Sequence, residues 1–422
     1  MATSRRSRSP NERELQLSRI GRALTLTFAA AVLVAGGVLY GLVVLLDFQE
    51  IDSTAKLDAK TLFDLVKLSF GVVAGAGALV ALVVAYRRQR VDEAGAHREA
   101  TRLHTERFSQ AVDRLGSDSP AVRLGGVHAL TGLADDAPDH SLRQTCIDVL
   151  CAYLQLPFTA DPGEDPAHEQ EHHRYLALRK VRHTILRLIG DHYRRPKGTH
   201  RSWQGCDLDL TGVTIDGNID FEGASFSDGR VSFLGAGFSG GTVSFRRAGF
   251  SGSTVSFFSA GFSGSEVSFD RAAFSGGEVS FADARFSSGT VSFRDAGFSG
   301  GAVSIMGAAF SGGEVSFRRA VFSGGAVFFG RATFAGSGVS FIDATFAGSG
   351  VPFVDATFSG GTVSFDRAAF SSGEVSFRSA RFFGGEVSFT DATGPAPSGL
   401  PAAVSTAYGP VALPSTWLPL NP

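Results

Sequence analysis

The chain has 422 residues, a formal net charge of −2 and three cysteines. This length allows several domains, and the balanced charge argues against a protein that binds nucleic acid through its overall charge. An odd cysteine count without a CxxC motif argues against a disulfide framework, so Cys146, Cys151 and Cys206 are expected to be buried thiols in a reducing compartment.

The first 86 residues alternate between polar and apolar stretches. Residues 1–22 form a basic tail with six arginines, and 23–46 is apolar apart from two threonines. Residues 47–61 form a short polar loop, and a second apolar stretch at 62–86 is followed at once by arginines. Each apolar stretch is long enough for a bilayer, which needs about 20 residues. The pattern predicts two transmembrane α-helices with the lipid bilayer as partner. Because arginines flank the hairpin on one side, the protein is expected in the plasma membrane, multi-pass, with both termini cytoplasmic.

The second apolar stretch contains a pair of glycines at the GxxxG spacing, Gly71 and Gly75. Small residues at this spacing allow helices to approach closely. They fit close packing of the two predicted helices, and they fit a homodimer equally well.

Helical patterns follow the apolar stretches. Residues 87–116 have apolar side chains on one stripe, which predicts a juxtamembrane helix, and 117–200 predicts a small all-α segment. Its first two helices resemble one HEAT-like repeat, although a plain helical bundle explains them equally well. Trp203 is expected to pack where these helices meet the next domain.

The next domain is a repeat of twelve residues that runs from Phe226 to Phe382 without insertion or deletion. Each unit carries two apolar pairs, Ala-x-Phe and Val-x-Phe, separated by turns rich in Ser and Gly, and Ile305 replaces one Phe. Apolar residues at period two, with glycine turns at fixed spacing, predict an all-β solenoid with Phe, Val and Ala inside. Unstructured low complexity is the alternative, but it does not explain the unbroken register.

The start of this domain carries a family resemblance. In the run from Asp207 to Ile215, an apolar residue stands two positions before a central residue, as Leu208 precedes Leu210 and Val213 precedes Ile215. The run resembles pentapeptide-repeat proteins. The resemblance implies a right-handed quadrilateral β-helix over 201–391, in which two twelve-residue units close one coil. A narrower helix with one unit per coil is the alternative. The tail at 392–422 is rich in Pro and Ala and is expected to be disordered.

One motif points to metal chemistry. His168, Glu169 and His172 match HExxH, in which two histidines on one helix face bind zinc. The turn is polar all round, so the expected role is a solvated first turn in which Glu169 favours the helix N-terminus. Neither the cysteines nor the other histidines have metal-ligand spacing. We therefore expect no catalytic, cofactor-binding or metal residues and no cofactor.

Three functions remain open at this stage. The first is a non-enzymatic, membrane-anchored scaffold that presents the solenoid to an unknown protein partner. The second is inhibition of a gyrase-type enzyme by DNA mimicry, and the third is a zinc hydrolase that uses residues 168–172. Between Phe221 and Asp391 there are fourteen acidic residues and twelve arginines, interleaved, which is a weak field for a DNA mimic. The first function is therefore preferred, and no nucleic acid is expected as a partner.

Overall fold

The computed structural model describes residues 59–417 except positions 160, 265, 288, 337, 406 and 408, together with seven helical positions between Phe28 and Tyr40. The chain divides into two compact units, Met1–Ala100 and Thr101–Pro422. The units are described separately below.

The first unit contains most of a long helix, α2 (Ala59–Leu115), which continues into the second unit. The apolar stretch at 62–86 lies inside this helix. None of the helices in the described part of the chain combines the length and the apolar character that a membrane crossing requires. Asp64 and Lys67 interrupt the stretch near its start, and glycines, which offer little apolar surface, lower its apolar content. The prediction of two transmembrane helices and of a multi-pass plasma-membrane location is therefore wrong. The first predicted span, 23–46, lies mostly outside the described residues.

The second unit begins with a small helical segment. It comprises the end of α2, α3 (Pro120–Asp135), α4 (His140–Gln155), the 3₁₀ turn η2 (Pro166–His168) and α5 (Glu169–Tyr193). Pro120 stands at the first turn of α3, and the Asp139 side chain caps α4 by accepting a hydrogen bond from the Leu142 amide. Gly126 of α3 lies so close to the end of α2 that a Cβ there would stand 2.6 Å from the Leu115 amide nitrogen. The segment is thus tightly packed, with Leu115 in its core.

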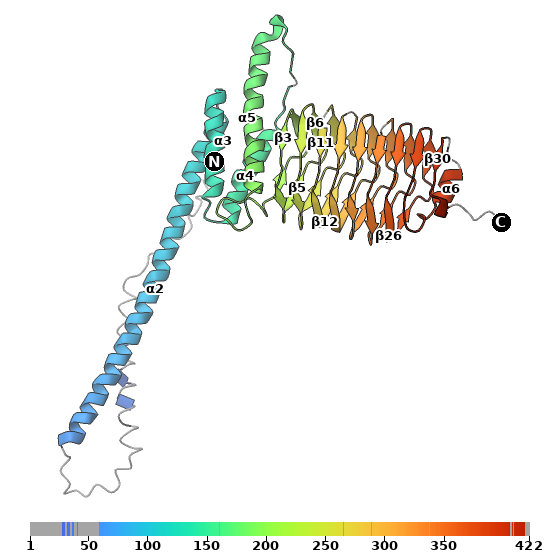
Figure 1. The fold of residues 1–422 in the computed structure, drawn as a ribbon. Coiled ribbons are helices and arrows are strands. Elements are labelled where there is room, and N and C mark those ends of the chain that lie inside the picture. Colours follow the sequence, from blue (N-terminus) through green and yellow to red (C-terminus); the bar gives the residue numbers. More distant parts are fainter. Residues whose placement is uncertain are drawn as a thin grey trace, which may run out of the picture. The chain divides into compact units, whose positions relative to one another are not determined.

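A right-handed β-solenoid of about eight coils follows (Figure 1), and its strands pair only in parallel among the described residues. The first sheet covers two faces of the coil, because β12 and β15 continue round the corner between them. Its strands are β1 (Leu208–Asp209), β4 (Ser225–Phe226), β5 (Arg230–Ser232), β8 (Gly249–Phe250), β9 (Thr254–Ser256), β12 (Ala273–Ser280), β15 (Gly297–Ser304), β18 (Val321–Phe322), β19 (Ala326–Phe328), β22 (Thr345–Ala347) and β26 (Ala369–Ser372). A short pair, β23 (Val351–Pro352) and β27 (Val375–Ser376), continues the column of β19.

Two further sheets complete the coil. The second sheet contains β2 (Thr214–Asp216), β6 (Gly237–Ser239), β10 (Gly261–Ser263), β13 (Arg285–Phe286), β16 (Ala309–Ser311), β20 (Thr333–Ala335), β24 (Thr357–Ser359) and β28 (Arg381–Phe383). The third sheet contains β3 (Ile219–Asp220), β7 (Thr242–Ser244), β11 (Glu266–Ser268), β14 (Thr290–Ser292), β17 (Glu314–Ser316), β21 (Gly338–Ser340), β25 (Thr362–Ser364), β29 (Glu386–Ser388) and β30 (Val411–Ala412). The coil therefore has four faces, which is compatible with the pentapeptide-repeat architecture.

Two twelve-residue units make one coil, as the preferred alternative predicted. Phe250 pairs with Phe274, and Val363 pairs with Val387, so each residue lies over the one 24 positions later. At the start of the solenoid the offset is one residue shorter, since Ile215 pairs with Phe238. The slip in the sequence between the pentapeptide run and the twelve-residue repeat causes this difference.

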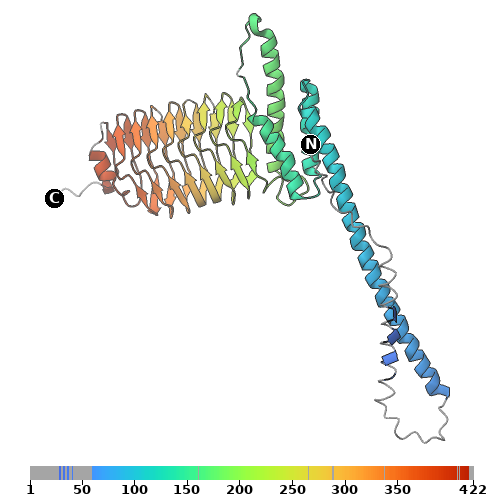
Figure 2. The same ribbon diagram turned by 180° about the vertical axis from the view of Figure 1, so that it is seen from behind.

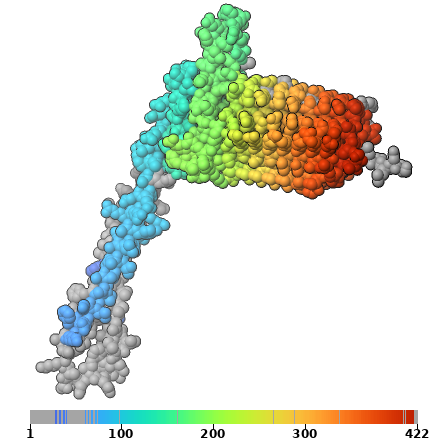
Figure 3. Space-filling view, viewed as in Figure 1, coloured from blue at the N-terminus to red at the C-terminus, as the bar shows by residue number. Residues whose placement is uncertain are grey.

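Ladders of aromatic rings fill the interior. Phe317, for example, is fully buried and stacks between Phe293 and Phe341, with ring centroids 4.8 Å from each. Val315 and Ala320 are buried beside it, because Val and Ala leave room for the rings. The distance between stacked ring centroids equals the distance between neighbouring strands, so strand pairing and ring stacking reinforce each other. The space-filling view in Figure 3 shows the resulting unbroken surface of the stacked coils.

The tail differs from the expected disordered segment. It forms α6 (Leu400–Ser405), β30 and the 3₁₀ turn η3 (Ser415–Trp417) at the last coil, which Figure 2 shows from behind. β30 pairs with β29, and Leu400 is buried. Trp417 contacts the rings of Phe370 and Phe389 at 5.6 Å each. The tail has few apolar residues, but they are enough to order it, because the open end of the last coil gives them a surface to pack against.

Candidate interaction surfaces

The first coil is covered by the helical segment, as expected for the end of a solenoid. Trp203 is fully buried where the helices meet the coil, which confirms its predicted place. Its ring stacks on His192 with centroids 4.2 Å apart, and its Nε1 donates to the Asp135 carboxylate at 3.1 Å. His192 Nε2 lies 3.0 Å from the same carboxylate. This cluster joins α3, α5 and the chain that enters the first coil, and its polar atoms already have partners, so its role is structural.

Side chains of the helices also satisfy backbone oxygens on the open edge of the first coil. Gln155 of α4 donates to the oxygen of Asp209 at 3.0 Å. Arg194 of α5 donates to the oxygens of Asp220 and Glu222 at 2.8 and 2.7 Å. Unpaired strand edges otherwise invite pairing with other chains, so these contacts close this end of the rod.

A second polar cluster surrounds Asp216 at the end of β2. Its carboxylate accepts hydrogen bonds from the Tyr175 hydroxyl and from Arg179 Nε at 2.8 Å, and His183 Nε2 lies 3.4 Å away. Burial alone would raise the pKa of Asp216, but the hydrogen bonds from His183 and Tyr175 and the charge of Arg179 outweigh it and lower the pKa to about 2. Burial and the carboxylate together raise the pKa of Tyr175 to about 12. The cluster is a charged clamp between α5 and the first coil.

The HExxH residues lie at the start of α5. His168 and Glu169 are exposed, while His172 Nδ1 contacts the Asp161 carboxylate at 2.7 Å. Within the described part of the chain, no group of three or more His, Cys, Asp or Glu side chains has metal-binding geometry. Asp161 thus holds the His172 ring through Nδ1, and no second and third ligand converge on its other nitrogen among the described residues.

The three cysteines are buried and free. Burial raises the pKa of Cys146 and of Cys151 to about 12 and that of Cys206 to about 11. Thiols in this state are poor nucleophiles and poor metal ligands.

The surface of the solenoid is chemically asymmetric. Each coil has two tight turns, twelve residues apart and hence on opposite sides. We call the turns that follow the third sheet the charged edge. Its outward residues are Arg246, Arg247, Asp270, Arg271, Arg294, Asp295, Arg318, Arg319, Ile342, Asp343, Asp366, Arg367, Thr390 and Asp391.

Ion pairs run along the charged edge from coil to coil. Arg319 binds Asp295 one coil earlier through two hydrogen bonds, at 2.6 and 2.9 Å. Arg367 binds Asp343 in the same way, at 2.7 and 3.0 Å. The hydrogen bonds from Arg319 lower the pKa of Asp295, and those from Arg367 lower the pKa of Asp343. Bidentate pairs of this kind hold guanidinium groups in fixed positions.

Three arginines of the charged edge do not form such ion pairs. Among the described residues, Arg246, Arg294 and Arg318 have no ion pair, and the first two are exposed. They share one position of the turn and lie in the first, third and fourth of four successive coils. Coils rise by about 4.8 Å, so the three guanidinium groups are distributed over about 14 Å. The sequence contains this strip, but it becomes visible only when residues are aligned in rows of 24.

The opposite turns form what we call the apolar edge. The first positions of these turns, one per coil, are Leu234, Phe258, Ala282, Met306, Gly330, Val354 and Arg378. Leu234 and Phe258 are 44% and 40% exposed, so this apolar surface is open to solvent. Phe328, on the neighbouring strand column, adds to it with 36% exposure.

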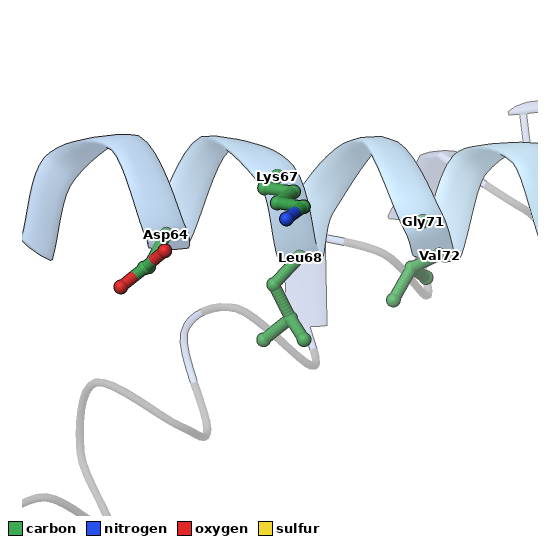
Figure 4. A pocket seen from close by; sticks show the side chains of 5 residues that line it. All are labelled: Asp64, Lys67, Leu68, Gly71 and Val72. Carbon is green, nitrogen blue, oxygen red and sulfur yellow. The ribbon is translucent and has the colours of Figure 1, made fainter. Parts of the chain in front are cut away.

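The described residues line several hollows, and two of them are considered for a site. One, of about 400 Å³, is open and lies along one side of α2, where Figure 4 shows Asp64, Lys67 and Leu68 beside Gly71 and Val72. The other, of about 190 Å³, lies between the β26–β27 corner and Pro395–Ser398 of the tail. Its lining is mostly apolar or backbone. Neither hollow brings together the convergent polar groups of a catalytic site.

Searches against protein families, characterised proteins and solved structures find no match for this chain. A function for this chain can therefore be inferred only from its fold and its surfaces. A β-solenoid repeat is typical of non-enzymatic proteins that bind other proteins.

Proposed function

We propose that the chain is a non-catalytic scaffold that binds a protein partner along the charged edge of the solenoid. The observation that carries this proposal is the strip of Arg246, Arg294 and Arg318, none of which forms an ion pair among the described residues, with Asp270 standing between the first two. Most of their neighbours on the edge are paired, so the strip is available to another molecule. A partner that fits presents carboxylates at intervals of about 5 to 10 Å, one or two coil spacings.

The rigidity of the rod supports this role. The ring ladders and the capped ends hold the backbone positions of the three arginines at fixed spacing, so a partner has only their side chains to order on binding. Arginine suits the task because its planar fork binds carboxylates through two hydrogen bonds.

The acidic residues of the rod do not gather on one face. Glu266, Glu314 and Glu386 stand on the corner between the second and third sheets, with at least one coil between each pair. DNA mimicry requires a dense field of one sign, and this spacing does not supply it. The interleaved charges therefore favour protein binding over DNA mimicry.

The test uses the full chain as bait in extracts of its own cell. One variant combines Arg246→Glu, Arg294→Glu and Arg318→Glu. The control makes the same charge change elsewhere on the rod, with Arg285→Glu, Arg378→Glu and Arg381→Glu.

A partner that carries an acidic surface should bind the wild type and the control, and it should be lost from the strip variant. Binding should also weaken steeply with salt, because the contacts are between exposed charges. Equal capture by all three baits, or a partner insensitive to salt, would contradict the proposal.

A further inference from the structure

The apolar edge carries three charges that the chain leaves unpaired. At the second position of these turns, directly after the first positions named above, Asp283, Arg331 and Asp355 are exposed. No ion pair involves any of them among the described residues. On the charged edge, by contrast, an arginine bonds the aspartate one coil earlier, as Arg319 does with Asp295.

Gly307 explains why two of these charges are left over. It occupies the turn position one coil after Asp283 and one coil before Arg331. With the arginine one coil after the aspartate, as in Arg319 and Asp295, a partner of either residue would have to stand at this position. Arg331 also has Asp355 one coil later, the arrangement of Arg271 and Asp295, but no ion pair joins Arg331 and Asp355 among the described residues. The glycine instead has φ +66°, and a Cβ there would overlap the Asp283 carboxylate. Asp283 and Arg331 therefore flank a bare row, whose outward residue is Met306.

A two-fold axis through this row makes the edge complementary to itself. An antiparallel second copy, centred on Met306, places Arg331 of one protomer opposite Asp283 of the other, twice. The same operation places Gly330 opposite Ala282 and Val354 opposite Phe258. Gly330 and Ala282 then leave room on either side of the Met306 pair, and opposite charges meet.

Other registers are worse. An axis one coil further along, through Gly330, places Arg331 opposite its own copy. An axis midway between the rows of Met306 and Gly330 places Asp283 opposite Asp355. Like charges that face each other oppose association. An axis midway between Gly330 and Val354 also pairs opposite charges, Arg331 with Asp355, but it leaves the exposed Leu234 and Phe258 outside the contact. Charge pairing and burial of Phe258 together therefore favour the register centred on Met306.

We infer that two copies of this chain associate antiparallel through their apolar edges, with the two-fold axis at Met306. The apolar contact runs from Phe258 to Val354 on each protomer, four coil steps or about 19 Å, and Leu234 meets Arg378 at its two ends. A single edge is narrow compared with the roughly 800 Å² per partner of a standard interface, so we expect a reversible dimer with a dissociation constant on the order of micromolar.

Disulfide trapping in the full chain tests the position of the axis. Met306→Cys places identical residues against each other and should form a disulfide-linked dimer under mild oxidation. Leu234→Cys is the control, since its partner in this register is Arg378 and it should not cross-link with its own copy. The native cysteines are buried, with pKa values raised by that burial, and should stay unreactive.

A mixed pair sharpens this test. Ala282→Cys and Gly330→Cys chains should each give little homodimer, but a mixture of the two should give the cross-linked heterodimer. Space exists for the second change, because a Cβ at Gly330 meets its nearest neighbour at 3.5 Å. Equal cross-linking at every position would overturn the inferred register.

Charge reversal tests the complementarity independently, with sedimentation equilibrium of the full chain as the measurement. Asp283→Arg should weaken the dimer at least tenfold, and so should Arg331→Asp, while the double variant should regain the dimer. Both residue types already stand at this left-handed turn position in other coils, so the backbone accepts the exchange. Asp355→Arg, which faces Ser259 in this register, is the matched control and should leave the dimer intact. A chain that stays monomeric, or a dimer that ignores both reversals, would overturn the inference.

Discussion

Gly190 of α5 lies against the main-chain oxygen of Asp220 in β3, so closely that a Cβ at position 190 would stand 2.7 Å from that oxygen. The helix can approach the strand only because glycine has no side chain there. Arg194, one turn later, then reaches the oxygens of Asp220 and Glu222. This pair of contacts seats α5 across the open end of the solenoid.

Gly190→Ala should therefore loosen the cap, because neither the strand nor the helix backbone can move without losing these hydrogen bonds. We expect a loss of about 1–3 kcal/mol in the free energy of unfolding. Faster amide hydrogen exchange in β3 should accompany it. Gly132→Ala is the matched control, since nothing lies within 4 Å of a Cβ in that part of α3. That change should be neutral or stabilising by up to about 1 kcal/mol.

Phe317→Ala should destabilise the middle of the rod. The ring is fully buried between Phe293 and Phe341, so its removal breaks two stacked contacts and leaves a cavity that the rigid coil cannot close. Such changes cost about 3–5 kcal/mol. Denaturant unfolding followed by circular dichroism measures the loss. Phe383→Ala, at a residue 42% exposed, should cost much less, and equal costs would contradict the ladder as the source of stability.

The ladder was predictable because each buried position repeats in the sequence with the same apolar residue. The two edges were not, although the residues are plain to read. Leu234, Phe258 and Met306 lie in different twelve-residue units with polar turns between them, and they form one edge only when two units close one coil. The strip that contains Arg294 became visible for the same reason. Sequence periodicity alone left open how many twelve-residue units form one coil, and the edges appear only when residues are grouped by coil.

The predictions of a membrane span and of a disordered tail were wrong for other physical reasons. The apolar stretch around Gly71 and Gly75 resembled a membrane span by local composition, whereas the helix that contains it continues to Leu115. The tail around Trp417 appeared disordered by composition, but a few apolar contacts suffice when the last coil supplies the rest of the surface. The membrane prediction failed because charged residues and glycines lower the apolar content of the stretch, whereas the tail depends on partners far away in the sequence.

Asp216→Asn should lower stability in a pH-dependent way. The folded state holds the pKa of Asp216 at about 2, below the ordinary 3.8, so the charged form is favoured by folding. Its contribution is therefore fully present above about pH 4 and is lost as the pH falls toward 2. Allowing for solvent screening of this half-buried group, we expect about 1 kcal/mol at neutral pH.

Urea unfolding of wild type and variant at pH 7 and near pH 2.5 measures this difference. The two proteins should differ at pH 7 and converge in acid. Asp118→Asn, at an exposed carboxylate, is the control and should change little at either pH. A wild-type advantage that persists unchanged in acid would show that the clamp acts through shape and not through charge.

Trp417→Ala should open the C-terminal end of the solenoid. The indole lies across the rings of Phe370 and Phe389, and its Nε1 donates to the oxygen of Gly394 at 2.8 Å. Without it, the last ring of the ladder faces water, and the β29–β30 pairing loses its cover. We expect a local loss of about 1–3 kcal/mol. Amide exchange in β29 should accelerate roughly in proportion, while exchange in the central coils should not change, because each coil contacts only its neighbours. Ser415→Ala, in the same turn but exposed, serves as the control. If β29 exchanges equally slowly in the tryptophan variant and the control, the tail does not cap the rod.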